Sequence, residues 1–339
     1  LELQRPLKRH RVADVAAEFF LDRLLENGTT TASVFCTVHP QSVDAFFAAS
    51  EARGLRMIAG KCLTDQHAPD GLRDTINTGY RDSKTLIERW HGHERSLYAI
   101  TPRFAPTSSI AQMETMRALA REHPDAYIQS HVAENRAEIA WVNELFPGRR
   151  SYLDVYDHFG LLRDKSIYAH CIYLDDADRT RMTSAGATPS FCPTSNLFIG
   201  SGLYDLKQAL EAGNCVSIGT DVGGGTSYSM LRTLGEAYKV QQLQGISLSP
   251  AYALYLATLG GAKALSIDDK LGSITVGKEA DFALLDPAAT PLLARRTSLR
   301  DDPLDTFFAM MTLGDDRAIA ATYVNGVCVH RRQGYDVSL

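Results

Sequence analysis

The stretch from residue 127 to residue 172 decides the fold. It contains two apolar segments, YIQSHVA at 127–133 and KSIYAHCI at 165–172, with a helical pattern at 135–146 between them. Neither segment alternates cleanly between polar and apolar residues, which is typical of strands covered on both faces. The same pattern continues outward and predicts strands at 29–35, 55–60, 96–104, 188–193 and 215–221, and helices at 12–27, 42–53, 80–90, 109–122, 204–212, 230–242 and 249–265. The sequence therefore predicts an α/β fold built on a parallel sheet.

The number of strands bears on the type of sheet. Seven strands are expected between residues 29 and 221, whereas a parallel barrel needs eight. An open, doubly wound sheet is compatible with this count alone. The polar residues described below favour a (β/α)8 TIM-type barrel in which seven strands are visible and the first strand is absent.

After residue 268 the sequence no longer alternates between helical and strand patterns. Residues 272–285 indicate a turn, a short strand, a second turn and another strand, and residues 320–329 indicate a hairpin around Asn325-Gly326. We therefore expect a barrel domain at 1–268 and a small β-sandwich portion with a C-terminal tail at 269–339.

Composition limits the classes of function. The 339 residues carry a formal net charge of −5, so the sequence has no excess of positive charge for binding nucleic acid. No apolar run approaches the roughly 18 residues of a membrane helix, and residues 1–6 lack the apolar core of a signal peptide. Six scattered cysteines indicate a reducing compartment. We expect a cytoplasmic protein without membrane or nucleic-acid partners.

Polar side chains stand at the carboxyl ends of four expected strands, where parallel barrels carry their chemistry. Each has an ordinary structural explanation: a buried histidine, a helix-start carboxylate or a turn aspartate. Their joint placement on four strands favours a site. The residues are Arg103 with Phe104, His131 with Glu134, His170, and Asp221.

This set of side chains has a coherent chemistry. Two imidazoles and a carboxylate suit zinc or iron, with a position left for water. Such a metal lowers the pKa of its water to about 7. Glu134 follows His131 closely enough to reach the same water, which makes it a natural general acid–base.

Two other motifs favour structural roles. His91-Gly92-His93 has the spacing of a ligand pair, but it precedes a strand and so falls at the amino end of the barrel, the stability face, which favours a solvated loop. Gly223-Gly224-Gly225 follows the last strand, where many barrels bind phosphate. No Lys or Arg lies between Gly219 and Met230 to pair with a phosphate.

Several segments together resemble the amidohydrolase superfamily, and within it the enzymes that deaminate guanine. The strand motifs are Ser130-His131-Val132-Ala133-Glu134-Asn135, Tyr168-Ala169-His170-Cys171, Phe191-Cys192-Pro193-Thr194-Ser195-Asn196-Leu197 and Gly219-Thr220-Asp221. The supporting segments are Asn27-Gly28-Thr29-Thr30-Thr31, Thr101-Pro102-Arg103-Phe104-Ala105, Ala257-Thr258-Leu259-Gly260-Gly261-Ala262, Gly272 to Asp286 and Leu313-Gly314-Asp315-Asp316-Arg317. The similarity extends over nearly all of the chain.

The resemblance implies a hydrolase with one Zn²⁺ per chain that converts guanine to xanthine and ammonia, and it suggests a homodimer. His131 and Asp221 would bind the zinc, and His170 would ligate it more weakly or orient the hydroxide. Glu134 would take the proton of the water and deliver it to the ring nitrogen beside the attacked carbon. Asp221 would help carry a proton to the leaving ammonia. The purine would lie against His131, Glu134, Asp221, Arg103 and Phe104, with Arg103 donating to its carbonyl oxygen and Phe104 lining a flat pocket.

One feature departs from the superfamily pattern. Its members begin with half of a β-sandwich and a first strand that ends in His-x-His, and neither His10 nor His39 has a histidine two residues away. We expect that an N-terminal segment with two further metal ligands is absent from this sequence.

Alternative functions stay open at this point. A related enzyme would deaminate a pterin, an 8-oxopurine or a triazine, and Arg103-Phe104 favours guanine over these rings. From another class, the chain would be a catalytically inactive form or a non-enzymatic oligomer partner.

Overall fold

A computed structural model describes residues 10–299 and 301–335 of the chain. The described chain divides into two compact units. The first comprises the residues up to Leu21, Thr31–Ser190 and Ala209–Cys215; the second comprises Asp22–Thr30, Phe191–Gln208 and the chain from Val216 onward. The expected division at residues 268 and 269 stays a prediction.

The first unit is built on a parallel sheet in the order β1-β2-β4-β5-β6-β7, with β3 pairing beside β4. Its strands are β1 (Thr31–Phe35), β2 (Arg56–Gly60), β3 (Cys62–Leu63), β4 (Leu97–Pro102), β5 (Tyr127–Val132), β6 (Ser166–His170) and β7 (Thr188–Phe191). Together with β8 (Ser217–Ile218), which belongs to the second unit, all seven expected strands form, and β3 is an additional short one.

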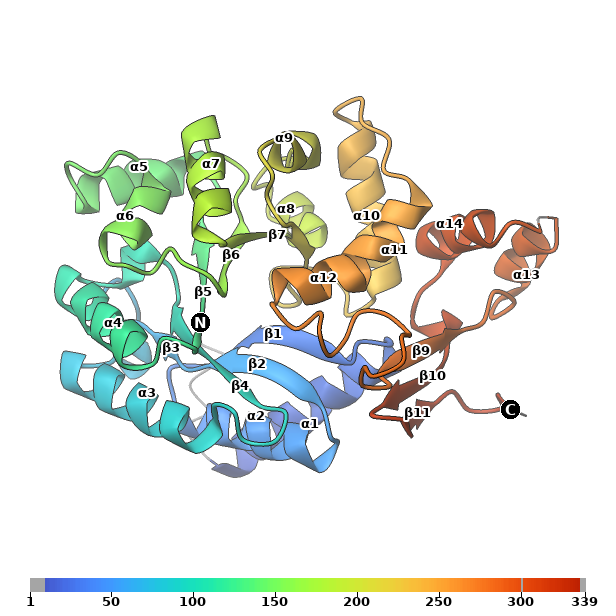
Figure 1. Ribbon diagram of the computed structural model, residues 1–339, viewed down its shortest axis with the longest axis horizontal. Coiled ribbons are helices and arrows are strands. Elements are labelled where there is room, and N and C mark those ends of the chain that lie inside the picture. The colour runs from blue at the N-terminus through green and yellow to red at the C-terminus, as the bar shows by residue number, and fades with distance from the viewer. Residues whose placement is uncertain (1–9, 300, 336–339) are drawn as a thin grey trace. The chain divides into compact units, whose positions relative to one another are not determined.

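Helices separate the strands as expected. In the first unit they are α1 (His10–Glu26, which continues into the second unit), α2 (Pro40–Ala52), α3 (Ile76–Trp90), α4 (Ile110–Glu122), α5 (Arg136–Leu145), α6 (Tyr152–His158) and α7 (Asp176–Ala185). Figure 1 shows α2, α3 and α4 side by side against β2 and β4. Helix α6 forms in a segment where the sequence interpretation placed no helix, and Ser151 caps its start by accepting a hydrogen bond from the Asp154 amide.

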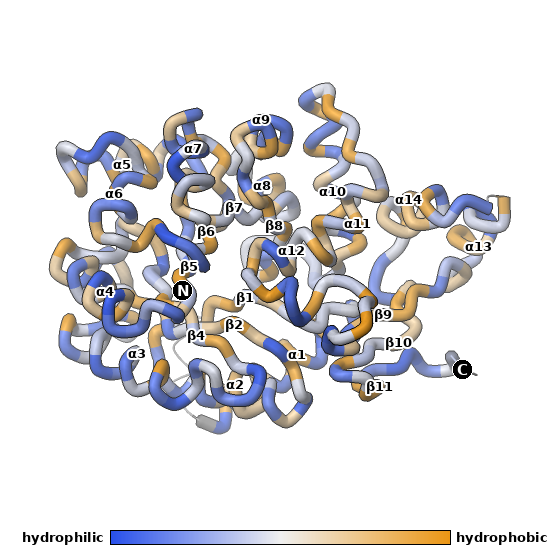
Figure 2. Tube along the Cα trace, in the orientation of Figure 1, coloured by the Kyte–Doolittle hydropathy of each residue, from blue (hydrophilic) through white to orange (hydrophobic). Residues whose placement is uncertain are grey.

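The sheet is apolar on both faces, as parallel sheets are. Met57, Ile58 and Ala59 of β2 are fully buried, and Figure 2 shows β2 as a largely hydrophobic strand. Strands β2 and β4 approach so closely that a Cβ on Gly60 would meet the backbone oxygen of Ala99 at 1.7 Å. This position accepts only glycine.

One buried amide shows that the sheet curls. The side chain of Gln129 in β5 donates to the Val34 backbone oxygen in β1 at 2.9 Å and accepts from the Ser33 hydroxyl at 2.6 Å. Two strands lie between β1 and β5 in the sheet, and neighbouring strands are about 4.8 Å apart. A flat sheet would hold these groups out of reach, so the contact requires the curvature of a barrel.

The second unit contains an antiparallel sheet in the order β11-β10-β9, formed by β9 (Phe282–Leu285), β10 (Ile319–Val324) and β11 (Val327–Arg331). The expected hairpin is confirmed: Asn325 and Gly326 both adopt positive φ between β10 and β11. The short strand expected near Ile274 was wrong, because residues 272–281 form turns and bends with Ile274 exposed.

The helices of the second unit are α8 (Pro193–Phe198), α10 (Met230–Gln242), α11 (Pro250–Ala257), α12 (Leu259–Ala264), α13 (Pro291–Thr297) and α14 (Pro303–Leu313), and α9 (Leu206–Glu211) starts there and ends in the first unit. The single helix expected at 249–265 is two helices, because Thr258 leaves the helical conformation (φ −129°, ψ −102°). None of the described helices has the length and apolar character that crossing a membrane requires.

Candidate active site

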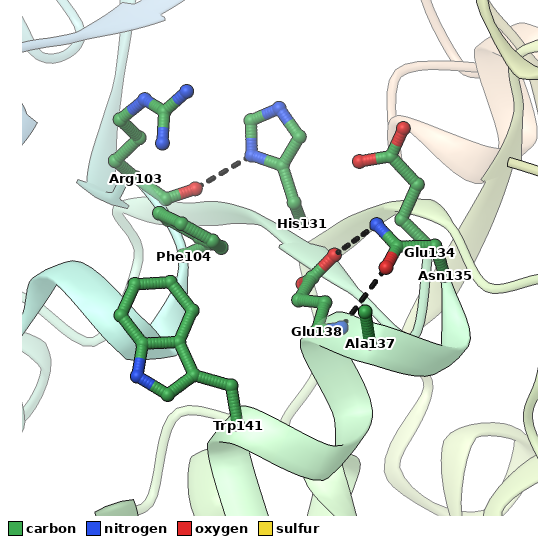
Figure 3. Close-up of a pocket in the computed structure, with 8 residues that line it drawn as sticks. All are labelled: Arg103, Phe104, His131, Glu134, Asn135, Ala137, Glu138 and Trp141. Carbon is green, nitrogen blue, oxygen red and sulfur yellow. Dashed lines mark hydrogen bonds between the residues drawn. The ribbon is translucent and has the colours of Figure 1, made fainter. Parts of the chain in front are cut away.

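A pocket of about 350 Å³ opens in the first unit at the carboxyl ends of β4 and β5 (Figure 3). Four of the site residues expected from the sequence line it, together with four that the sequence interpretation missed. The lining residues are Arg103, Phe104, His131, Glu134, Asn135, Ala137, Glu138 and Trp141.

His131 is held by the backbone of a neighbouring strand end. Its Nδ1 lies 2.6 Å from the carbonyl oxygen of Arg103, and Phe104 forms an isolated parallel bridge with His131 (Figure 3). A carbonyl can only accept, so Nδ1 carries the proton and Nε2 keeps its lone pair. Burial, together with the charges of the nearby His170 and Arg103, lowers the pKa of His131 to about 3. The ring is therefore neutral at physiological pH, the state that a metal ligand needs.

His170 ends β6 beside the same residues. Its ring centroid lies 5.4 Å from that of His131 with an angle of 25° between the planes, and its Nε2 lies 3.6 Å from Glu134 Oε2. The side chain is buried, and the backbone is left-handed (φ +71°). A histidine in this conformation at a strand end is a local strain that marks functional sites.

Glu134 reaches the pocket because the chain turns sharply after β5. Ala133 is left-handed (φ +50°), and Asn135 then caps α5 by accepting the Glu138 amide at 2.9 Å. This turn places the Glu134 carboxylate near His170 and on the lining of the pocket that also holds His131. The sequence interpretation expected these three side chains together, and the structure brings them together.

Arg103 and Phe104 follow directly after β4, which ends at Pro102. The Arg103 guanidinium lies 4.7 Å from the centre of the Phe104 ring, which is a cation–π contact. A planar cation with five donors beside an aromatic ring suits a flat heterocycle that carries a carbonyl oxygen.

Glu138 is a second carboxyl on the pocket wall. It is 8% exposed, and the Asn135 side-chain amide donates to its Oε2 at 3.4 Å (Figure 3). Burial raises the pKa of Glu138 to about 7. The spacing Asn135-x-x-Glu138 resembles a capping box, and this signal could have identified both residues from the sequence.

Asp221 belongs to the second unit and lies three residues after β8. Its backbone is left-handed (φ +46°), and its carbonyl oxygen accepts from the Gly224 amide at 3.1 Å. One of its carboxylate oxygens and Cys192 Sγ lie within 4.8 Å of each other. A Cβ on Gly225 would meet the Thr220 backbone oxygen at 2.1 Å, so the glycine run lets this turn fold tightly.

The pair His91 and His93 lies in the segment before β4, and both side chains have structural partners. His91 Nδ1 accepts from the Tyr98 amide at 3.0 Å, and its Nε2 lies 3.2 Å from Asp125. His93 packs against Trp90 beyond the end of α3. Both therefore lie near the amino end of β4, away from its carboxyl end.

Comparisons with known proteins agree with this geometry. The Amidohydrolase family model matches residues 6–329. The guanine deaminase of Escherichia coli (strain K12) is 53% identical over 314 residues, which is 93% of this chain and 72% of that protein. The solved structure named E. coli guanine deaminase matches with a TM-score of 0.96 and 51% identity, over 97% of this chain and 77% of that one. The guanine deaminase from C. acetobutylicum with bound guanine in the active site matches with a TM-score of 0.89 and 27% identity, over 96% of this chain and 78% of that chain. The predicted barrel class is therefore confirmed.

Proposed function

The chain belongs to the amidohydrolase family, and we propose on this basis that it hydrolyses guanine to xanthine and ammonia. It is thus a hydrolase that acts on the C–N bond of a cyclic amidine. The observation that carries the proposal is the pocket in which Arg103 and Phe104 face an imidazole and a carboxylate, His131 and Glu134. The 53% identity to a guanine deaminase supports guanine as the substrate.

Enzymes of this family are typically metal-dependent, and the residues fit a metal. His131 is neutral, with its Nδ1 engaged and its Nε2 lone pair available. We propose that one Zn²⁺ binds to His131 and Asp221, with His170 as a weaker ligand or a partner of the water. When bound, zinc supplies a water whose pKa is near 7.

Glu134 is the proton carrier of the proposed reaction. It takes a proton from the attacking water while the water oxygen bonds to the ring carbon that bears the amino group. It delivers that proton to the adjacent ring nitrogen. His170, 3.6 Å from Glu134 Oε2, helps to orient the water. Asp221 helps to carry the second proton of the water, from the hydroxyl now on the ring carbon, to the amino group; the C–N bond breaks, the C=O bond of xanthine forms, and ammonia leaves.

Arg103 and Phe104 orient the purine. The guanidinium donates to the purine carbonyl oxygen, and a charged donor makes this contact strong and directional. Its stacking on Phe104 at 4.7 Å limits the rotamers of the arginine, so less freedom is lost when the substrate binds. Phe104 offers an aromatic edge or face to the ring.

A substrate panel tests the proposal. Guanine, a pterin, an 8-oxopurine and a triazine are each incubated with metal-loaded protein, and loss of the substrate absorbance is followed. We expect guanine to give the highest kcat/KM. Turnover of a pterin, an 8-oxopurine or a triazine without turnover of guanine would show that the chain deaminates that other ring. No turnover of any ring by metal-loaded protein would indicate an inactive form.

We also propose a homodimer in the cytoplasm. All six cysteines lie within the described residues and none of them forms a disulfide bond, which supports a reducing compartment. Light scattering during gel filtration tests the assembly, and a molar mass of one chain would exclude the dimer.

A further inference from the structure

We propose that Trp141 is a specificity-determining wall of the purine pocket, and that His67 holds the Trp141 ring in place. The inference rests on the proposed guanine deamination and adds two residues to the binding surface. Neither residue carries any step of the reaction described above.

Trp141 enters the pocket from α5. It lies three residues after Glu138, so that both side chains stand on the same helical face, and both line the pocket (Figure 3). Its ring lies edge-to-face with Phe104, with a centroid distance of 6.2 Å and an angle of 72°. Two aromatic rings at right angles thus bound the space beside the Arg103 guanidinium.

His67 supports Trp141 from a different loop. The two ring centroids are 5.1 Å apart, and the planes meet at 64°, a T-shaped contact. His67 is exposed and has left-handed backbone (φ +50°). An exposed histidine can fix the position of the Trp141 ring only if other contacts fix the backbone of its own loop.

The loop is held before His67 by the segment that follows Phe104. The Asp65 amide donates to the Thr107 carbonyl at 3.0 Å, and the Asp65 carboxylate accepts the Ser109 amide at 2.7 Å. The Gln66 side chain donates to the Pro106 carbonyl at 3.1 Å. These bonds tie the loop of His67 to the loop of Phe104.

The loop is also closed at its base. The Asp74 amide donates to the Thr64 carbonyl at 2.7 Å, which brings the two ends of the loop together. The fully buried Lys61 ammonium contacts both Asp74 carboxylate oxygens, at 2.6 and 2.7 Å. Residues 64–74 therefore form a compact Ω-type loop with His67 in its interior span.

This arrangement predicts an effect on binding and little effect on the chemical step. A tryptophan ring has no group that gives or takes a proton at neutral pH, and its contact with a flat heterocycle is similar in the ground state and the transition state. Loss of the ring raises KM with little change in kcat. Aromatic contacts of this kind correspond to changes of about two- to tenfold.

The chain allows a direct optical test, because it contains two tryptophans, Trp90 and Trp141. Trp90 stacks on Phe47 and donates to Asp44 at 2.8 Å, outside the pocket lining. Trp90→Phe leaves Trp141 as the fluorophore, and Trp141→Phe leaves Trp90. We expect xanthine, the reaction product, to quench the emission of Trp90→Phe saturably and to leave that of Trp141→Phe unchanged. Equal quenching in both variants would overturn the inference.

Steady-state kinetics provide a second test of the role of Trp141. We expect Trp141→Leu to raise the KM for guanine about tenfold with kcat within a factor of about three. His67→Asn removes the ring and keeps a residue that accepts left-handed backbone, and we expect it to raise KM about two- to threefold. The matched control is His93→Asn, because His93 packs edge-on against the other tryptophan, Trp90, at 6.2 Å and 70°. An unchanged KM in Trp141→Leu, or an equal rise in His93→Asn, would refute the inference.

Different results would overturn the proposed function and the role of Trp141. If unmodified, metal-loaded protein does not convert guanine, the proposed function fails whatever the tryptophans do. If it converts guanine and Trp141→Phe and Trp90→Phe respond alike to xanthine, the function stands and the role of Trp141 falls. The Phe variants keep an aromatic ring at each position, so the fluorescence test does not depend on whether Trp141→Leu folds.

Discussion

The Nδ1 of His131 lies 2.6 Å from the backbone carbonyl oxygen of Arg103. One residue thus serves the site twice: its main chain fixes the tautomer of a proposed metal ligand, and its side chain faces the pocket. The backbone contact does not depend on the side chain at position 103. The two roles can therefore be separated by substitution.

Arg103→Met removes the guanidinium and keeps the carbonyl. A hydrogen bond to a charged group contributes about 1.5–3 kcal/mol, so we expect kcat/KM for guanine to fall about 10- to 100-fold. Metal content, measured by elemental analysis, stays at the level of unmodified protein. Loss of metal together with activity would show that the side chain supports the His131 site itself.

Arg103→Lys is the matched variant that keeps the charge. Lysine lacks the planar fork that stacks on Phe104 and donates from fixed positions. We expect kcat/KM between those of Arg103→Met and unmodified protein. Full activity in Arg103→Lys would contradict a role for guanidinium geometry.

Glu134→Gln keeps the size of the side chain and removes its ability to carry a proton. We expect kcat to fall about 100- to 10,000-fold, which is the usual contribution of general acid–base catalysis, with zinc retained. The measurement is single-turnover guanine conversion with metal analysis of the same sample. Glu138→Gln is the control, since it changes the other pocket carboxyl, and retained turnover in Glu134→Gln would refute the assigned role.

Glu138 makes stability depend on pH. Burial raises its pKa to about 7 from an ordinary 4.5, so between these pH values the folded state binds more protons than the unfolded state. The free energy of unfolding therefore falls as pH rises from 4.5 to 7, by about 3 kcal/mol from this group, and regains that amount on acidification to 4.5.

The side chain at position 138 cannot ionise in Glu138→Gln, so this variant lacks the pH-dependent contribution of Glu138 to the free energy of unfolding. We expect its free energy of unfolding, relative to that of unmodified protein, to increase by about 3 kcal/mol between pH 4.5 and pH 8. Urea titrations of chelator-treated protein measure the difference without a contribution from metal release. A difference that does not change with pH would contradict the raised pKa.

The buried pair Lys61 and Asp74 closes the loop of His67, and its removal is predicted to be costly. Lys61→Met leaves the Asp74 carboxylate, 8% exposed, without its cation, and we expect a loss of about 3–5 kcal/mol in the free energy of unfolding. The double variant Lys61→Met/Asp74→Leu removes both charges and should recover most of that loss. Equal destabilisation in the single and double variants would show that the pair itself carries the stability.

Much of the sheet and part of the site could be predicted from the sequence. Strand ends such as His131 and His170 combine an apolar run with a metal-type side chain, and both the run and the side chain are local features. The sequence does not reveal that Ala133 is left-handed, although this turn brings Glu134 to the pocket. Proximity along the chain was sufficient to expect Glu134 near His131.

Other features depend on distant contacts and escaped prediction. His67 and Trp141 are 74 residues apart in sequence, and they meet because backbone hydrogen bonds tie the loop of His67 to the segment after Phe104, whose ring packs against Trp141. The break at Thr258 interrupts a stretch that is apolar on both sides of it. In each case tertiary contacts or a single dihedral angle outweigh local preference.

The central claim is tested most directly by measuring xanthine and ammonia together while metal-loaded protein consumes guanine. We expect that one xanthine and one ammonia appear for each guanine lost, that a chelator stops the reaction, and that Zn²⁺ restores it. Protein that contains about one zinc per chain and forms neither product would contradict the account.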